Sequence, residues 1–135
     1  GPVGSTHQHA TFKVYLEGKE LNLLDSKYMV RSQHVHIEGG DAETIHKHAT
    51  GVDLGFFFKT LGFKFDKECF KIDTGKDYCT NGDKVLQFYV NGVRNEEYNN
   101  HEIKEGEKYL ITYGDENETQ IQEQLNSIKE AKEES

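Results

Sequence analysis

The sequence predicts an α+β domain, in which paired strands form most of the core and one amphipathic helix lies between the second and third strand pairs. Three stretches are rich in alternating apolar and polar residues, a pattern typical of half-buried strands, and they fall within residues 11–24, 33–49 and 85–113. Between the last two, residues 50–62 carry the apolar spacing of a helix. The length of 135 residues favours a single domain.

We expect three parts along the chain. Residues 1–5, GPVGS, resemble the remnant of a cleaved expression tag and are left out of the fold prediction. Residues 6–115 should form the domain itself. Residues 116–135 should form an acidic helical tail that docks by a narrow apolar stripe and frays after Lys129. The stripe consists of Ile121, Leu125 and Ile128.

The charge balance excludes two classes of partner. The chain has 24 acidic and 16 basic residues, with a formal net charge of −8. A nucleic-acid surface needs a basic face to meet phosphates, and an anionic membrane attracts the same kind of face. No stretch approaches the roughly 18 apolar residues of a transmembrane helix. We therefore expect no nucleic-acid partner and no membrane span.

The first strand pair is predicted within residues 11–24, TFKVYLEGKELNLL. A two-residue turn at Gly18-Lys19 would set Leu16 opposite Leu21, with glycine supplying a positive φ. Alternation places three apolar side chains on one face of the first strand: Phe12, Val14 and Leu16.

The second strand pair lies in HVHIEGGDAETIHKH, which runs from His34 to His48. The register of this hairpin decides where its histidines point, because a slip of one residue moves every side chain to the other face. An odd-numbered loop within Gly39–Glu43 would set His36 opposite His46 and His34 opposite His48. It would also leave Val35, Ile37 and Ile45 together on the other face.

A two-residue turn at Gly40-Asp41 would instead set His36 opposite Ile45 and mix the two faces. The hydrophobic pattern favours the odd loop. We therefore expect all four histidines of this hairpin on one face: His34, His36, His46 and His48.

The predicted helix follows directly. Thr50 with Asp53 three residues later suggests a capping box, and Gly62 is placed to end the helix. Its apolar stripe consists of Leu54, Phe57, Phe58 and Leu61. Beyond it, short strands are expected at Lys64–Phe65 and Phe70–Ile72.

The last strand pair turns at Asn91-Gly92, the strongest short hairpin signal, and a final strand is expected at Tyr109–Tyr113. From residue 34 to 114 the order of elements resembles a β-grasp (ubiquitin-like) core, with an added N-terminal β-hairpin and a C-terminal helix. FYVNGV…EIKEGEKYLITYG is similar to the closing strands of small sulfur-carrier β-grasp proteins. Those proteins end in Gly-Gly and this chain does not, so thiocarboxylate chemistry is not expected.

The two cysteines are expected to form a disulfide. Cys69 and Cys79 have nine residues between them, which is not the C-x-x-C spacing of a thioredoxin-type pair. The surrounding DTGKDYCTNGD is polar, an unfavourable setting for a free thiol. The alternative is two free thiols in a cytosolic protein. The disulfide favours an extracellular location, a periplasmic-like space or the cell surface.

The paired histidines predict a metal site. Residues i and i+2 of a strand share a face, and directly opposed Cβ atoms lie about 4.5–5.5 Å apart. Imidazole nitrogens from such neighbours can meet one ion at roughly 2.0–2.1 Å. Neutral imidazole suits zinc and copper, so a copper or zinc ion is the expected cofactor, held primarily by the four histidines of the hairpin.

A third H-x-H pair, His7 and His9, precedes the first strand on its predicted outer face. These two are expected to be auxiliary ligands or a second site. Acidic residues at the hairpin turn, Glu38, Asp41 and Glu43, could add oxygen ligands, although turn residues are often acidic for conformational reasons.

The expected function is therefore capture, buffering or delivery of Cu(II) or Zn(II), with a metal-bridged oligomer or a client metalloenzyme as possible partners. One alternative is a small mononuclear metalloenzyme with three histidines and an open position, as in the ligand arrangement of α-type carbonic anhydrases. Another is a β-grasp interaction module whose histidine face senses pH. A solvated histidine face without a ligand is the simplest alternative. No residue is assigned a catalytic role.

Taken together, HQHATF…KYM…HVHIEG…IHKHATGVDLGFFFKTLGF resembles a group of small exported histidine-rich proteins of ammonia-oxidising archaea and some bacteria. The resemblance covers roughly residues 7–115. It implies an exported domain that binds metal through its H-x-H pairs. Some members carry disulfide-isomerase labels, which the absence of C-x-x-C does not support.

Overall fold

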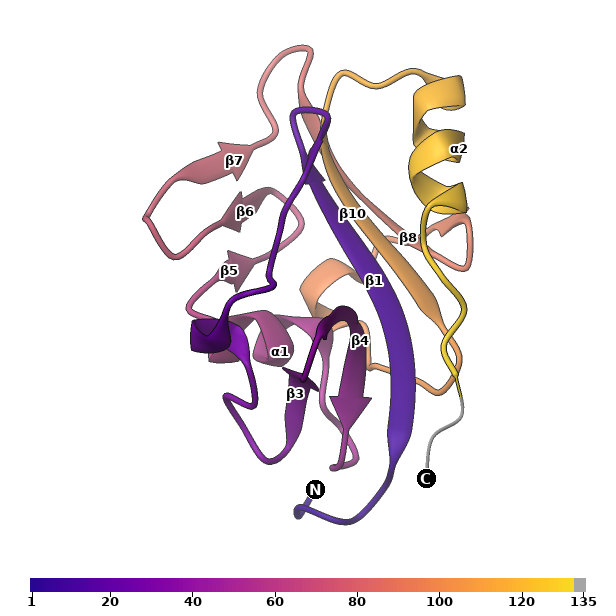
Figure 1. Ribbon diagram of the computed structural model, residues 1–135. Coiled ribbons are helices and arrows are strands. Elements are labelled where there is room, and N and C mark those ends of the chain that lie inside the picture. Colours follow the sequence, from indigo (N-terminus) through magenta and orange to yellow (C-terminus); the bar gives the residue numbers. More distant parts are fainter. Residues whose placement is uncertain (133–135) are drawn as a thin grey trace.

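The protein is a mixed α+β domain with a mostly β core and two α-helices, as expected from the sequence. The computed structural model describes residues 1–132 (Figure 1). Within them, no helix is long and apolar enough to cross a membrane. The main sheet has the strand order β3-β4-β1-β10-β8-β9, with β2 paired to β1, and a smaller sheet has the order β5-β6-β7.

The elements have the following bounds. The strands are β1 (Gln8–Leu16), β2 (Lys19–Glu20), β3 (Val35–Glu38), β4 (Asp41–Lys47), β5 (Lys64–Phe65), β6 (Cys69–Lys71), β7 (Asp77–Cys79), β8 (Val85–Val90), β9 (Val93–Arg94) and β10 (Lys108–Gly114). The helices are α1 (Leu54–Thr60) and α2 (Glu118–Asn126), with short 3-10 turns η1 (Ser26–Tyr28) and η2 (Tyr98–Asn100).

The N-terminal strand lies at the centre of the main sheet. β1 runs parallel to β10, with Phe12 opposite Tyr109, and antiparallel to β4. The expectation of an N-terminal hairpin added outside the core was therefore wrong. Only the two residues of β2 form the hairpin partner, because β1 finds its longer partners far along the chain.

The turn of that short hairpin is Glu17-Gly18, one residue earlier than predicted. Leu16 lies opposite Lys19 instead of Leu21. Both central residues have positive φ, 54° for Glu17 and 80° for Gly18. Glycine takes the second central position, as in the common Asn-Gly type of tight turn. The predicted Asn91-Gly92 turn has the same form, with φ values of 51° and 81°, and is confirmed.

The histidine hairpin has the predicted register but not the predicted turn. His36 lies opposite His46, while Glu38 lies opposite Asp41, so the turn consists of Gly39-Gly40 alone. A register shift between His36 and Glu38 gives β4 extra residues. These extra residues set His36 opposite His46 although the turn has two residues. The sequence had predicted this pairing from a loop with an odd number of residues.

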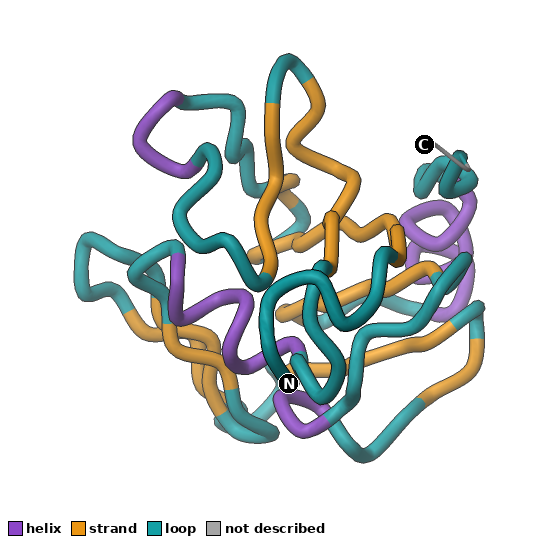
Figure 2. The backbone as a smooth tube through the Cα atoms, turned by 90° about the horizontal axis from the view of Figure 1, so that it is seen from below, coloured by secondary structure: helices purple, strands orange, loops and turns teal. Residues whose placement is uncertain are grey.

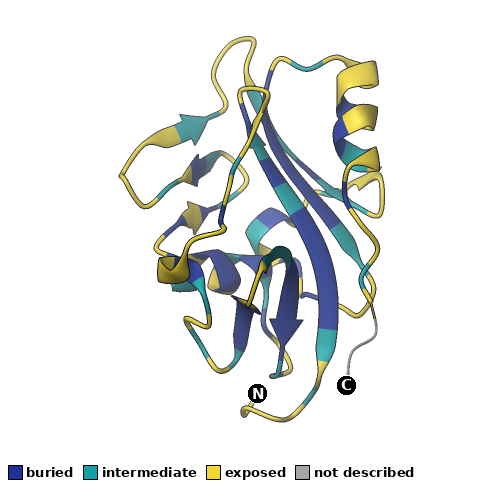
Figure 3. Cartoon of the chain, in the orientation of Figure 1, coloured by how far each residue is buried: buried dark blue, intermediate teal, exposed yellow. Residues whose placement is uncertain are grey.

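The core lies between the main sheet and a layer formed by α1 and the smaller sheet (Figures 1 and 3). The apolar residues of the histidine hairpin are fully buried there, as predicted: Val35, Ile37 and Ile45. Phe12 of β1 meets Phe57 and Phe58 of α1 edge-on, at centroid distances of 5.4 and 5.8 Å.

Helix α1 begins later than predicted. Its N-cap is Asp53, whose side chain accepts a hydrogen bond from the Phe56 amide at 2.8 Å, so the capping box from Thr50 was wrong. Its C-cap is Leu61, followed by Gly62 with φ 85°, and the predicted end is confirmed.

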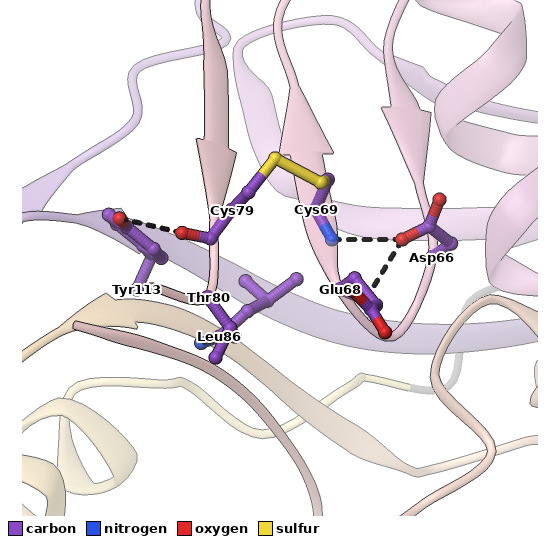
Figure 4. Close-up of a disulfide and its surroundings, with 7 residues drawn as sticks. All are labelled: Asp66, Glu68, Cys69, Cys79, Thr80, Leu86 and Tyr113. Carbon is purple, nitrogen blue, oxygen red and sulfur yellow. Dashed lines mark hydrogen bonds between the residues drawn. A yellow bond between two sulfur atoms is a disulfide. The ribbon is translucent and has the colours of Figure 1, made fainter. Parts of the chain in front are cut away.

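The smaller sheet carries the predicted disulfide (Figure 4). Cys69 and Cys79 face each other across β6 and β7. The Asp66 carboxylate accepts hydrogen bonds from the amides of Glu68 and Cys69, at 2.9 and 2.8 Å. The Tyr113 hydroxyl donates to the Cys79 carbonyl at 2.9 Å and so links the smaller sheet to β10.

Helix α2 covers the opposite face of the main sheet (Figures 1 and 2). The tail docks by its apolar stripe as predicted, with Ile121 and Ile128 buried against Leu110. The chain then follows β1, where the Thr11 hydroxyl donates to the Lys129 carbonyl at 2.7 Å. Beyond Lys129, where fraying was predicted, Glu130 forms an ion pair with Lys108 at 2.7 Å, and residues 133–135 lie outside the described residues.

Candidate metal centre

Three histidines form a row across the edge of the main sheet. His36 of β3 lies opposite His46 of β4, and His46 lies opposite His9 of β1. Directly opposed residues of antiparallel strands have their Cβ atoms about 4.5–5.5 Å apart on the same face. Strand pairing alone therefore brings these three imidazoles together.

A second row lies one H-x-H step further along. His48 follows β4, and its amide donates to the carbonyl of His34 at 2.8 Å. On its other side the carbonyl of His48 accepts from the Gly4 amide at 2.7 Å, which draws the N-terminal segment alongside. His7 lies on this segment, immediately before β1.

Five imidazoles contact one another in a closed circuit. The distances between ring centroids are 5.7 Å for His36 and His46, 4.9 Å for His46 and His9, 4.8 Å for His9 and His7, 4.9 Å for His7 and His48, and 5.1 Å for His48 and His36. We call these residues the five-histidine cluster. Each ring contacts two others, so the five side chains form one continuous cluster.

The cluster is buried on one side and open on the other. His9, His36 and His46 are buried, His48 is half-buried, and His7 is exposed. The exposed His7 therefore provides access to the cluster from solvent.

His34 is the predicted ligand that the structure leaves apart. It precedes β3, and its ring lies edge-on to Phe56 at 6.2 Å. The primary set predicted from the sequence thus contributes three members to the cluster, and the auxiliary pair His7 and His9 contributes both of its members.

Glu38 is the acidic neighbour of the cluster. Its carboxylate lies 2.8 Å from Nε2 of His36 and 4.0 Å from Nδ1 of His46. Burial alone would raise the pKa of Glu38. The hydrogen bond with His36 and the charges of the neighbouring histidines outweigh that effect and lower the pKa.

His36 is held at both ring nitrogens. Its Nδ1 lies 2.9 Å from the carbonyl of Ser32, and its Nε2 faces Glu38. A carbonyl and a carboxylate both accept hydrogen bonds, so each ring nitrogen of His36 already faces an acceptor. Neither nitrogen is directed to a metal in this arrangement.

His9 is held differently. Its amide donates to Oε1 of Glu105 at 2.8 Å, and its ring Nδ1 lies 3.8 Å from the same oxygen. Its Nε2 is buried and has no hydrogen-bond partner within residues 1–132. A buried nitrogen without a partner lowers the stability of the fold, so a ligand bound to this atom would recover free energy.

The pKa of His48 is lowered, first by burial and then by the charges of His36 and His7. Glu38 opposes this shift. A lowered pKa keeps an imidazole neutral, and neutral imidazole is the form that binds metals.

The side chains do not form a closed coordination sphere as they stand. Among residues 1–132, no group of three or more histidine, cysteine, aspartate or glutamate side chains has the arrangement of a metal site. The rings contact each other and the acidic neighbours instead. A cavity of about 230 Å³ adjoins the cluster and is lined by Glu38, Thr44, His46 and Lys129, among others.

The sequence analysis missed a second buried histidine with charged partners. His101 lies 2.7 Å by Nδ1 from Glu97 and 2.8 Å by Nε2 from Glu107. The hydroxyl of Tyr109 donates to the same oxygen of Glu107 at 2.7 Å. In the sequence, only the four-residue spacing of Glu97 and His101 could have indicated this contact. Glu107 reaches His101 because the chain turns between them.

Fold and site together define a small disulfide-bonded α+β domain with a cluster of histidines on the edge of its sheet. No protein-family model, no curated protein and no solved structure matches the chain.

Proposed function

We propose that the protein captures, buffers or delivers a transition-metal ion, Cu(II) or Zn(II), at the five-histidine cluster. The observation that carries this proposal is the closed circuit of ring contacts among residues that lie on three adjacent strands or directly beside them. Five neighbouring imidazoles offer more nitrogen donors than either metal needs.

The cost of the arrangement supports the same proposal. Like charges that face each other across strands destabilise a sheet, and each imidazole can be protonated near neutral pH. The unpartnered Nε2 of His9 adds a desolvation cost. A bound metal ion would remove both costs, because it binds imidazoles in their neutral form, which do not repel each other as charges, and it takes the unpartnered nitrogen as a ligand.

The donor set favours Cu(II) or Zn(II) among biological metals. Both cysteines are committed to the disulfide, so imidazole nitrogen is the main donor available. Hard ions such as Ca²⁺ and Mg²⁺ prefer oxygen ligands. Both ring nitrogens of His36 already face acceptors, Ser32 and Glu38, so the proposed ligands are the other four members of the cluster: His7, His9, His46 and His48.

We also infer a β-grasp-like core and an extracellular location. The core assignment is supported by the parallel contact of β1 with β10, flanked by β4 and β8, and by α1 following β4. The location is supported by the disulfide, which is compatible with an oxidising compartment. The resemblance to exported histidine-rich proteins implies the same location.

The proposal is tested by competitive Zn²⁺ and Cu²⁺ titration of three variants. One replaces His7 and His9 by Ala, the second replaces His46 and His48, and the third replaces His34. We expect the first two to weaken binding by at least about 100-fold, since each removes two ligands and a loss of about 1.4 kcal/mol for each ligand already gives that factor. His34→Ala should bind like the unaltered protein, because its ring lies against Phe56.

Circular dichroism of all three metal-free variants provides the folding control. Absence of tight binding by the unaltered protein would exclude the metal function. Equal loss in the His34→Ala variant would contradict the assignment of the ligands to the cluster.

A further inference from the structure

Glu105 lies beside His9, the cluster histidine whose buried Nε2 has no hydrogen-bond partner within residues 1–132. Its Oε1 accepts the amide of His9 at 2.8 Å and lies 3.8 Å from Nδ1 of the same residue. The carboxylate is thus anchored to the backbone of the residue whose ring it flanks. Nδ1 lies near the acid but beyond hydrogen-bond distance, so a small shift of the ring or the carboxylate would join them. Nε2 remains without a partner in the described part of the chain.

The turn that carries Glu105 is fastened along β1. The Gly106 amide donates to the carbonyl of His9 at 2.8 Å, and the Thr11 amide donates to the carbonyl of Glu107 at 3.0 Å. Three hydrogen bonds therefore connect the start of β1 with the Glu105–Glu107 segment. Two of these bonds join backbone to backbone and hold the turn against β1, and the third uses the Glu105 carboxylate itself.

His101 contacts the same turn through Glu107. Its ring is buried between the carboxylates of Glu97 and Glu107, which lie 2.7 Å from Nδ1 and 2.8 Å from Nε2. The hydrogen bond with His101 lowers the pKa of Glu97. Burial raises the pKa of Tyr109, which keeps its hydroxyl a donor to Glu107.

We propose that Glu105 is a positioning residue for the metal site: it accepts the Nδ1 proton of His9 and presents Nε2 as the ligand atom, while the Glu97–His101–Glu107 bridge holds its turn in place. This inference rests on the proposed metal-binding function. It explains why His9 Nε2 is buried without a partner while its amide and Nδ1 face an acid.

The chemistry is that of a second-shell carboxylate. A ligand histidine that donates its other N–H to a carboxylate has its ring orientation and tautomer fixed and becomes a better donor. Loss of such a partner lowers metal affinity by about 10–100-fold. The bridge at His101 acts one step further away and should have a smaller effect.

The test compares Zn²⁺ affinity, by competition with a chromophoric chelator, in the unaltered protein and in Glu105→Gln, His101→Gln and Glu96→Gln. Glu96→Gln is the matched control, because it removes the same charge from an exposed side chain paired with Arg94. We expect a loss of about 10–100-fold for Glu105→Gln, a smaller loss for His101→Gln, and no loss for the control beyond a general charge effect.

Two-bond ¹⁵N–¹H spectra of the zinc-loaded protein provide the readout that a purely structural role would not change. In the unaltered protein the proton of His9 should reside on Nδ1, with zinc on Nε2. Glu105→Gln should shift the Nδ1 resonance or mix the tautomers. Glu105→Asp retains the charge but shortens the reach, and it should resemble Glu105→Gln if position matters.

The outcomes separate this inference from the proposed function. No zinc binding by the unaltered protein would defeat both. Binding in the unaltered protein with equal affinity in Glu105→Gln would overturn only the role of Glu105. A His9 proton on Nε2 in the loaded protein would also overturn it.

Discussion

His48 shows how the five-histidine cluster makes the metal-free protein sensitive to acid. Its pKa lies below the ordinary value of 6.5, because burial and the charges of His36 and His7 disfavour its protonated form. The unfolded chain therefore binds a proton at His48 before the folded chain does. Stability must decrease as pH falls through 6.5 and stop decreasing below the folded-state pKa.

We predict that the melting temperature of the metal-free protein falls between about pH 7.5 and 5, and that His48→Gln reduces this fall. Each kcal/mol lost should lower the melting temperature by about 4 °C for a domain of this size. The measurement is thermal unfolding in the presence of a chelator over a pH series. His34→Gln serves as the control, and an identical pH profile for His48→Gln and the unaltered protein would contradict the assignment.

At the same scale, the sequence predicted part of the cluster correctly, and the limits have a physical cause. Alternation of apolar residues was enough to place His36 opposite His46, since a buried face fixes the register. His9 lies opposite His46 because β1 pairs with β4, and these two strands are separated along the chain by β2, η1 and β3. No local pattern contains that information.

At the scale of elements, the disulfide acts on a region with little other support. β5, β6 and β7 have two or three residues each and form a sheet apart from the main one. Such short strands are marginal alone. The cross-link between β6 and β7 removes conformational freedom from the unfolded chain, and the Tyr113 hydrogen bond attaches β7 to the main sheet.

We predict that replacing Cys69 and Cys79 together by Ser lowers the free energy of unfolding by about 2–3 kcal/mol, the expectation for a loop of this length. Denaturant unfolding of the double variant and of the reduced protein should agree. Metal affinity should remain unchanged, because neither strand carries a cluster histidine. A variant as stable as the unaltered protein would show that the smaller sheet does not need its cross-link.

Local signals predicted those elements whose chemistry is contained in a few adjacent residues. The Asn91-Gly92 turn, strand β5 and the end of α1 at Gly62 were all correct for this reason. The turn at Gly18 and the start of α1 were shifted, because two nearby residues could fill each role and tertiary pairing selected between them. The Gly39-Gly40 turn was missed because a register shift in β4 gave the same offset.

At the scale of the whole molecule, one buried lysine joins the histidine hairpin to the turn region before β10. Lys47 lies on β4 between His46 and His48, and its side chain is only 1% exposed. Its ammonium donates to Glu102 at 3.0 Å and to the carbonyl of Ile103 at 2.5 Å. The alternation of β4 that turns His46 and His48 outward therefore turns Lys47 into the core, where Glu102 and the Ile103 carbonyl compensate for its charge.

We predict that substitutions of Lys47 and Glu102 lower the free energy of unfolding by different amounts. Glu102→Gln leaves a buried ammonium without its counter-charge and should cost about 2–3 kcal/mol, less than for a fully buried pair because Glu102 is almost half exposed. Lys47→Met removes the charge while keeping a side chain of similar length, so it should cost less than Glu102→Gln. Once Lys47 is Met, the further change Glu102→Gln should have almost no effect. A double-mutant cycle by urea unfolding checks this, and additive effects of the two changes would mean that the pair does not link the hairpin to the turn region.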